Sequence, residues 1–202
     1  MPDNELGRSL VTAARDAIGA ELGESGGTVS NAVPDQPEHP ALALPGATFV
    51  TLSKHGALRG CIGSLEARRP LGVDVRANAV AAAFADPRFP PLSTDEFIDT
   101  SVEVSLLSAT EAVASESERA LLDRLRPGID GVVLEFAGRR ATFLPQVWDS
   151  LPEPPAFLAE LKRKAGLPID FWSAAVKVSR YGVTKWRETD LRTDFHSVEA
   201  AS

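Results

Sequence analysis

Two apolar stretches joined by a short turn, between residues 48 and 63, limit what this chain can fold into more than any other feature. Residues 48–53 have the composition of a strand, with Phe49, Val50 and Leu52 as its apolar members. Residues 54–57 form a turn, and residues 58–62 can return alongside the first stretch. Apolar runs separated by a few turn residues are typical of a β-hairpin. We therefore expect an antiparallel pair of strands here.

The rest of the chain alternates irregularly between helix and strand patterns. The patterns predict helices over residues 5–22, 70–85, 116–125 and 156–165, and strands over residues 100–107, 132–136, 140–144 and 175–181. This order indicates an α+β fold with a mainly antiparallel sheet and flanking helices. We expect a single domain over residues 1–187, with Pro-rich bends at 86–91 and 145–155 between two lobes. Residues 23–45 are then a long loop, and residues 188–202 a polar tail.

Composition and charge exclude several classes of protein. Of the 202 residues, 44% are hydrophobic, which is enough for a packed interior and argues against a disordered chain. The formal net charge of -7 repels polyanions, which argues against a nucleic-acid-binding regulator or an anionic-membrane protein. No stretch approaches the roughly 20 apolar residues needed to span a bilayer.

The cysteine count and the first residues bear on localisation. Cys61 is the single cysteine, so a disulfide within the chain cannot form, and nothing suggests an oxidising compartment. The first residues lack the basic start and apolar core of a signal peptide. We expect a cytoplasmic protein.

The strongest chemical candidate is Cys61, which lies between Gly60 and Gly63. Glycines allow a sharp turn or the close approach of a ligand or of a neighbouring backbone. Arg59, just before Gly60, and His55 across the turn make an electropositive setting, which favours a nucleophilic thiolate. The alternative is a small buried hydrophobic side chain, since free cysteine is among the most buried residue types. The sequence leaves both interpretations open.

Two further side chains are candidates for ligand binding. Arg88 lies in a stretch stiffened by prolines, and the arginine fork suits carboxylate and phosphate groups. Glu103 belongs to the polar face of its strand, where it can pair with an arginine or act as a general base. The three histidines are widely spaced and no Cys-x-x-Cys motif is present, so we expect neither a metal site nor a cofactor.

Several motifs in order resemble the AMMECR-type domain family over about residues 5–187, and within it the bacterial branch called AmmeMemoRadiSam system protein A. The resemblance is carried by these segments: Phe49-Val50-Thr51-Leu52, Leu58-Arg59-Gly60-Cys61-Ile62-Gly63-Ser64-Leu65, Asp86-Pro87-Arg88-Phe89-Pro90-Pro91-Leu92, Val102-Glu103-Val104-Ser105, Leu125-Arg126-Pro127-Gly128-Ile129-Asp130-Gly131 and Ala141-Thr142-Phe143-Leu144-Pro145-Gln146-Val147-Trp148.

The resemblance implies a two-lobed α+β domain with residues 58–63 near a cleft. It also implies a pathway shared with a Memo-like protein and a radical SAM enzyme. We expect the cleft to bind a small anionic ligand or a modified side chain of a partner, with Arg59, Gly60, Arg88 and Glu103 as ligand-binding residues. The alternative is an enzyme that uses Cys61 as its catalytic nucleophile. A binding module needs only the arginine-lined surface, whereas the enzyme needs an accessible, ionised thiol.

Overall fold

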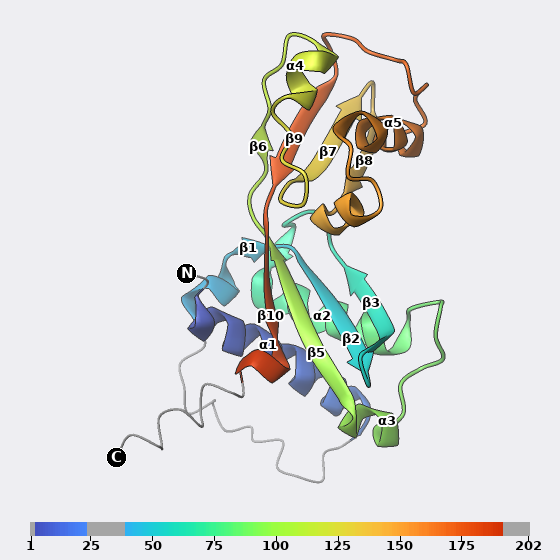
Figure 1. Cartoon of the computed structure of the whole chain (residues 1–202). Coiled ribbons are helices and arrows are strands. Elements are labelled where there is room, and N and C mark those ends of the chain that lie inside the picture. Colours follow the sequence, from blue (N-terminus) through green and yellow to red (C-terminus); the bar gives the residue numbers. More distant parts are fainter. Residues whose placement is uncertain (1–2, 24–38, 192–202) are drawn as a thin grey trace, which may run out of the picture. The chain divides into compact units, whose positions relative to one another are not determined.

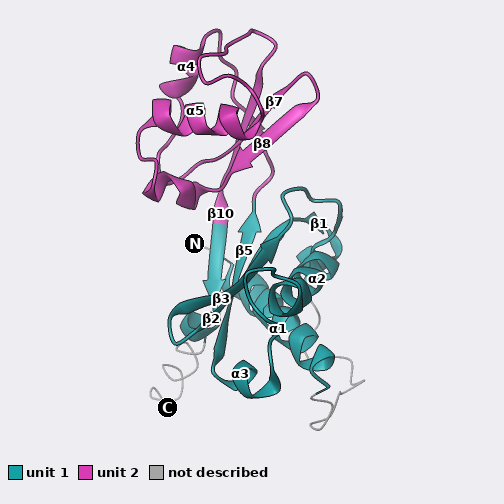
Figure 2. Cartoon of the chain, turned by 90° about the vertical axis from the view of Figure 1, so that its right-hand side faces the viewer, with its two compact units in different colours: residues 1–107, 184–202 teal, residues 108–183 magenta. Residues whose placement is uncertain are grey.

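A computed structural model describes residues 3–23 and 39–191 of the chain. The chain divides into two compact units, which Figure 2 shows in different colours. Unit 1 comprises residues 1–107 and 184–202, and unit 2 comprises residues 108–183. The Pro-rich bend at residues 86–91 lies within unit 1, and the bend at residues 145–155 lies within unit 2.

Unit 1 is built on a four-stranded sheet with the strand order β10-β5-β2-β3 (Figure 1). Its strands are β2 (Thr48–Lys54), β3 (Ala57–Gly63), β5 (Thr100–Leu107) and β10 (Val183–Arg187). The central strand β2 pairs antiparallel with β3 on one side and with β5 on the other. A register shift between Leu52 and Ser53 makes Arg59 the extra residue of a β-bulge in β3.

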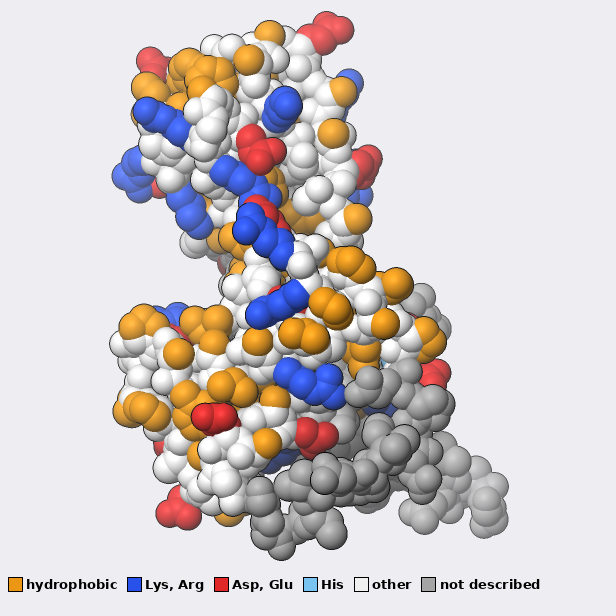
Figure 3. All heavy atoms as spheres, turned by 180° about the vertical axis from the view of Figure 1, so that it is seen from behind, with side chains coloured by type: hydrophobic (Ala, Val, Ile, Leu, Met, Phe, Trp, Pro, Cys, Tyr) orange, Lys and Arg blue, Asp and Glu red, His pale blue; other side chains and the backbone are white. Residues whose placement is uncertain are grey.

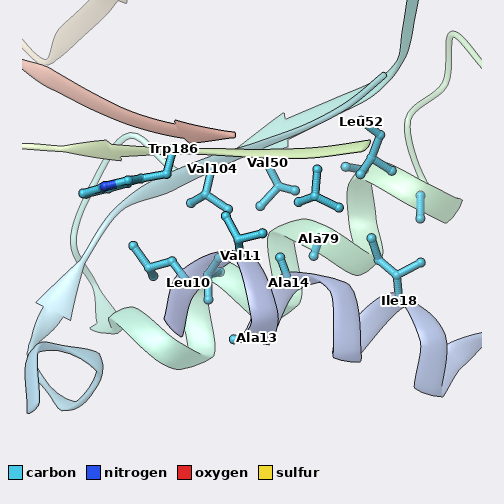
Figure 4. Close-up of a cluster of buried hydrophobic side chains, with 14 of the residues drawn as sticks. Leu10, Val11, Ala13, Ala14, Ile18, Val50, Leu52, Ala79, Val104 and Trp186 are labelled. Atoms are coloured by element: carbon cyan, nitrogen blue, oxygen red, sulfur yellow. The ribbon is translucent and has the colours of Figure 1, made fainter. Parts of the chain in front are cut away.

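Two helices, α1 (Asn4–Glu21) and α2 (Leu71–Phe84), cover one face of this sheet (Figure 1). The Asp3 side chain accepts hydrogen bonds from the first backbone amides of α1, and Pro70 immediately precedes α2. In Figure 4, Val50 and Val104 from the strands and Leu10 from α1 meet in one buried cluster. This cluster also includes Trp186 of β10. The hydrophobic core of unit 1 therefore lies between the sheet and the two helices.

Shorter elements complete unit 1. A 3-10 helix, η1 (Pro40–Ala43), leads into β1 (Pro45–Gly46), which pairs with β4 (Arg69–Pro70). Helix α3 (Thr94–Ile98) begins with a capping box, in which Ser93 and Glu96 satisfy each other's backbone amides.

Unit 2 has its own sheet and its own hydrophobic core. Its strand order is β6-β9-β7-β8, from β6 (Glu111–Ala112), β7 (Gly131–Phe136), β8 (Arg139–Phe143) and β9 (Lys177–Tyr181). The helical elements are α4 (Glu118–Leu122), η2 (Pro145–Asp149) and α5 (Pro154–Lys164). In the core, the rings of Trp148 and Phe157 stack with their centroids 3.7 Å apart.

The structure confirms the predicted α+β class and the antiparallel hairpin of β2 and β3. The predicted helix over residues 116–125 is too long, because α4 ends at Leu122. Strand β10 and helix α3 were not predicted. Residues 188–191 are helical with Leu191 buried, which corrects the start of the predicted tail. Residues 24–38 of the predicted loop and residues 192–202 of the tail lie outside the described residues.

None of the helices within the described ranges is both long and apolar enough to cross a membrane.

Substituting Gly60 tests how closely β3 and α2 pack. A Cβ atom at Gly60 would lie 2.1 Å from the carbonyl oxygen of Ala82, which belongs to the helix backbone and cannot swing aside. We expect Gly60→Ala to lower the free energy of unfolding by about 1–3 kcal/mol, measured by urea denaturation. Gly19→Ala is the matched control, because its Cβ would meet only a Phe97 ring atom at 3.7 Å, an ordinary contact. Equal stability of the two variants would contradict this packing.

Candidate functional site

The candidate site lies on the face of the unit 1 sheet that points away from α1 and α2. Val50 and Leu52 of β2 are fully buried in the core, as is Val104 of β5. Successive side chains of a strand point to opposite faces, so Thr51 and Glu103 lie on the other face. The structure therefore separates an apolar face, which the helices cover, from a polar face.

Three side chains form a row across the polar face. Thr51 of β2 pairs with Cys61 of β3 on one side and with Glu103 of β5 on the other. The Thr51 hydroxyl donates a hydrogen bond to Cys61 Sγ at 3.4 Å. Cys61 and Glu103 are two strand spacings apart, about 10 Å, so they do not contact each other directly. A ligand that touches both would have to lie across Thr51.

Strand β10 adds two cations to this row. Trp186 is in the core, so its neighbours Lys185 and Arg187 point to the polar face. Arg187 Nε donates to Glu103 Oε2 at 2.6 Å, and Lys185 Nζ lies 3.7 Å from Glu103 Oε1. The hydrogen bond to Glu103 and the charge of that carboxylate raise the pKa of Arg187, and Asp190 adds a smaller effect. Arg187 and Lys185 thus both form ion pairs with the same carboxylate, that of Glu103.

The arginine fork of Arg187 remains available. Its only hydrogen bond among the described residues uses Nε, which leaves both terminal amino groups without a partner there. The side chain is 62% exposed, so solvent or a ligand can reach it. A guanidinium group in this state can bind a carboxylate or a phosphate through two parallel hydrogen bonds.

Arg88, by contrast, is held by a carboxylate of its own segment. Its Nε and Nη2 donate to Asp86 at 2.9 and 2.7 Å, and its backbone amide donates to the same side chain at 3.1 Å. Asp86 also accepts the backbone amide of Cys61 at 2.8 Å, and Arg88 Nη2 donates to the Cys61 carbonyl at 3.3 Å. The hydrogen bonds from Arg88 are the main reason that the pKa of Asp86 lies far below its ordinary value, although burial opposes the shift.

Arg59 is held in the same way by Glu96 of α3. Its Nε and Nη2 donate to the two carboxylate oxygens at 3.2 and 2.9 Å, and Nη2 also donates to the carbonyl of Pro90 at 2.9 Å. The hydrogen bonds from Arg59 are the main cause that lowers the pKa of Glu96 to about 2. The guanidinium carbons of Arg59 and Arg88 lie 5.8 and 5.5 Å from the centroid of the same ring, that of Phe89.

The two predicted arginines are therefore neighbours, and an internal carboxylate binds each of them through Nε and Nη2. Among the described residues, Arg59 Nη1 is buried without a hydrogen-bond partner. Their proposed role in binding an anion stays a prediction.

The glycines of the motif have packing roles. Gly60 faces the backbone of α2, and a Cβ at Gly63 would lie 2.2 Å from the ring of Phe49. The sequence left open whether these glycines make room for a ligand or for neighbouring protein atoms. In the structure, neighbouring protein atoms occupy the space at both glycines. His55 lies in the turn of the hairpin, four positions beyond the Thr51–Cys61 pair, or about 13 Å along the strand. The structure does not assemble a Cys61–His55 dyad.

A second polar cluster, which the sequence reasoning missed, is centred on the buried carboxylate of Asp74 on α2. Asp74 Oδ2 accepts from Thr48 N and Oγ1 and from Asn78 Nδ2, while Oδ1 accepts from Ser64 Oγ and Arg69 Nε, all at 2.8–2.9 Å. This network joins the start of β2, the residue after β3 and the first turns of α2. Because hydrogen bonds satisfy both carboxylate oxygens, we assign it a structural role.

Sequence signals for the missed residues were present. Asp74 and Asn78 are four positions apart, which places both on one face of a helix. Lys185 and Arg187 flank Trp186 with the period-two alternation of a strand. Within the described ranges, no group of three or more His, Cys, Asp or Glu side chains is placed to hold a metal ion.

Comparison with known proteins identifies relatives over nearly the whole chain. The family described as AMMECR1 matches residues 11–186. A protein of Sulfolobus acidocaldarius is 37% identical over 201 residues, which cover 94% of this chain and 85% of that protein. A protein of Methanothermobacter thermautotrophicus is 38% identical over 182 residues, which cover 87% of this chain and 90% of that protein. Both relatives are archaeal.

A solved structure has a similar fold. The crystal structure of an uncharacterised protein from Pyrococcus horikoshii matches with a TM-score of 0.74 and 33% sequence identity. The match covers 92% of this chain and 93% of that one.

The pair of Arg59 and Glu96 predicts a specific pH dependence of stability. The folded state lowers the pKa of Glu96 from 4.5 to about 2, so the ionised pair stabilises the fold above about pH 4.5. This contribution is lost as the pH falls from about 4.5 to 2, because the carboxylate then becomes protonated. We expect Glu96→Gln, which can keep the cap of α3, to be less stable than the wild type at pH 6.

The difference between the two proteins should vanish near pH 2, measured by urea denaturation across the pH range. Glu160→Gln is the control, because its partner Arg163 is exposed on α5 and the pair is three residues apart on one helix. A stability difference for Glu96→Gln that does not change between pH 6 and pH 2 would contradict the assignment.

Proposed function

Because the chain belongs to the AMMECR1 family, we propose that it is a binding component of a pathway that also includes a Memo-like protein and a radical SAM enzyme. The motifs over residues 58–65, 86–92 and 125–131 support this proposal, since they resemble the bacterial AmmeMemoRadiSam system protein A. In this role the protein binds a small anionic ligand, or a modified anionic side chain of a partner, on the polar face of the unit 1 sheet.

The free fork of Arg187 beside Lys185 is the observation that supports an anionic ligand best. Arg59 and Arg88 each bind a carboxylate in bidentate fashion through Nε and Nη2, Arg59 with Glu96 and Arg88 with Asp86. Arg187 touches Glu103 through Nε alone, and Lys185 shares that carboxylate. Among the described residues, an anion would therefore not have to displace a bidentate partner from Arg187, a displacement that would cost much of the binding energy.

Thr51 and Cys61, the other two residues of the row, are polar but carry no fixed charge. The Thr51 hydroxyl and the Cys61 thiol lie in line with Glu103 on adjacent strands, so they can contact the uncharged part of a ligand held by Arg187. A nucleic-acid ligand fits less well. On the face of unit 1 in Figure 3, Lys and Arg side chains form separate small groups among hydrophobic and uncharged atoms, without one continuous basic surface.

Titration with inorganic phosphate tests the anion site. We expect phosphate to shift the backbone amide NMR signals of Thr51, Glu103 and Lys185, because the anion would bind Arg187 on the same face. Arg187→Ala should weaken phosphate binding by about tenfold or more, as expected when a bidentate charged contact is lost. Lys177→Ala is the matched control, because it removes one exposed cation from unit 2.

Equal effects of Arg187→Ala and Lys177→Ala would mean that phosphate responds to net charge alone. NMR signal shifts confined to residues other than Thr51, Cys61, Glu103 and their neighbours on β10 would also contradict an anion site at Arg187. The pathway assignment is tested separately, by co-purification of this chain with its Memo-like and radical SAM neighbours from native cells.

A second candidate function is an enzyme that uses Cys61 as a nucleophile. One observation favours it: the Thr51 hydroxyl donates to Cys61 Sγ at 3.4 Å, so the sulfur lies among polar side chains and not in the apolar core. The thiol is only partly exposed, and the register separates it from His55. The described residues around Cys61 thus offer a donor to the sulfur, but no histidine base beside it.

Iodoacetamide labelling distinguishes the two functions. We expect native Cys61 to react more slowly than free cysteine, because the thiol is partly buried, and to react faster after denaturation. Native labelling faster than that of free cysteine, with a rate that follows deprotonation, would instead support the enzyme.

A further inference from the structure

Strand β3 is an edge of the unit 1 sheet, because β2 pairs with it on one side only. An edge strand presents backbone groups that can pair with another chain, and proteins usually protect such edges. At Cys61, both backbone groups point away from β2. They are satisfied by side chains: Asp86 Oδ2 accepts from the amide at 2.8 Å, and Arg88 Nη2 donates to the carbonyl at 3.3 Å.

Asp86 and Arg88 thus occupy the two positions that a residue of a neighbouring strand would fill. In an antiparallel hydrogen-bonded pair, one residue donates its amide to its partner and accepts the partner's amide. Here the carboxylate replaces the acceptor and the guanidinium replaces the donor. Arg88 Nη2 and Nε also donate to the Asp86 carboxylate, at 2.7 and 2.9 Å. The acceptor and the donor are therefore held in place by each other.

The surrounding segment holds this pair rigidly. It follows the end of α2, Pro87 stands between the two residues, and the Asp86 carbonyl accepts the backbone amide of Phe89 at 3.1 Å. The Asp86 side chain is only 2% exposed, whereas that of Arg88 is 53% exposed. The carboxylate is therefore part of the packed fold, and the arginine places a charge at the outer side of the edge.

Strand β3 has little protection of its own. Its seven residues are Ala57-Leu58-Arg59-Gly60-Cys61-Ile62-Gly63, in which the single charged side chain, Arg59, is buried against Glu96. Edge strands that remain unpaired in solution usually carry an exposed charge, a proline or a covering segment. Without Asp86 and Arg88, the outer side of β3 near Cys61 would be an uncharged row of backbone groups.

We propose that Asp86 and Arg88 form an edge lock, which prevents β3 from pairing with β3 of a second copy of this chain. The same strand in antiparallel orientation is self-complementary about a twofold axis. With Cys61 opposite its counterpart, the two residues would exchange both of the hydrogen bonds that the lock now makes. Two locked edges cannot do so, because the acceptor and the donor are already filled and the two exposed Arg88 side chains repel each other.

The single cysteine of the chain gives a direct test of this pairing. The Cα atoms of a hydrogen-bonded antiparallel pair are about 5.5 Å apart, so a short bis-maleimide can join two Cys61 thiols across the paired edges. We expect Asp86→Ala/Arg88→Ala to self-associate about tenfold more tightly than the wild type in analytical ultracentrifugation. Bis-maleimide should convert the variant, but not the wild type, to a covalent dimer.

Two controls separate edge pairing from general effects. Glu160→Ala/Arg163→Ala removes an exposed ion pair from α5 without touching an edge, and it should behave as the wild type. Adding Cys61→Ser to the lock variant should abolish the covalent dimer while the association remains. If the double variant does not unfold cooperatively, Arg88→Ala replaces it, because it frees the Cys61 carbonyl and removes the repulsion between the two Arg88 side chains. Since Asp86 still caps the Cys61 amide, we expect a smaller gain in association than for the double variant. A folded lock variant with wild-type association and no Cys61 cross-link would overturn the proposal.

Discussion

The register of the central strand β2 determines the arrangement of the candidate site. Thr51 pairs with Cys61 on one side and with Glu103 on the other, so one residue sets the positions of two neighbours. Side chains alternate between the two faces of a sheet, and a slip of one residue in either pairing would turn Cys61 or Glu103 towards the helices. Such a slip is costly. A shift of β5 would turn Val102 and Val104 out of the core, and a shift of β3 would place a side chain where Gly60 now meets the backbone of α2. The packing of the hydrophobic face therefore determines which side chains lie on the polar face.

The buried carboxylates maintain this register at the ends of the strands. Asp74 ties the start of β2 to α2, and Asp86 holds the edge strand at Cys61. Buried charges are stable only when they are paired and fully hydrogen-bonded, and both residues meet this condition. The arginines that pair with Asp86 and Glu96 are consequently part of the framework. At the opposite edge of the sheet, the terminal amino groups of Arg187 on β10 have no partner among the described residues.

Sequence patterns predicted the fold where the periodicity was strong. Residues 100–107 alternate without interruption, and the hairpin of β2 and β3 has clear apolar runs around a turn, so both were found with accurate bounds. Strand β10 was missed because its five residues contain two cations and follow closely on β9. The candidate site was harder to predict. Arg59 and Glu96 are 37 positions apart, and a sequence alone does not indicate which carboxylate will meet which arginine.

The pair of Asp86 and Arg88, by contrast, has a local sequence signal. Asp86 and Arg88 are separated only by Pro87, and an aspartate often binds the backbone amide two residues later. That short-range contact orients the arginine side chain back towards the carboxylate. The charge of Arg88 alone suggests an external anion, whereas in the structure Asp86 binds its guanidinium group. A carboxylate two residues away thus competes with any external anion for an arginine.

The close approach of α2 to β3 links the packing of the sheet to the exposure of its cysteine. Gly60 has no side chain, so the helix backbone lies against the strand at this point. The next residue, Cys61, must then point to the polar face, where the Thr51 hydroxyl meets its sulfur. Its backbone is held by Asp86 and Arg88, and its side chain by the neighbouring strand. A thiol fixed in this way on a sheet is suited to precise recognition of a small group, because little reordering is needed when the group binds.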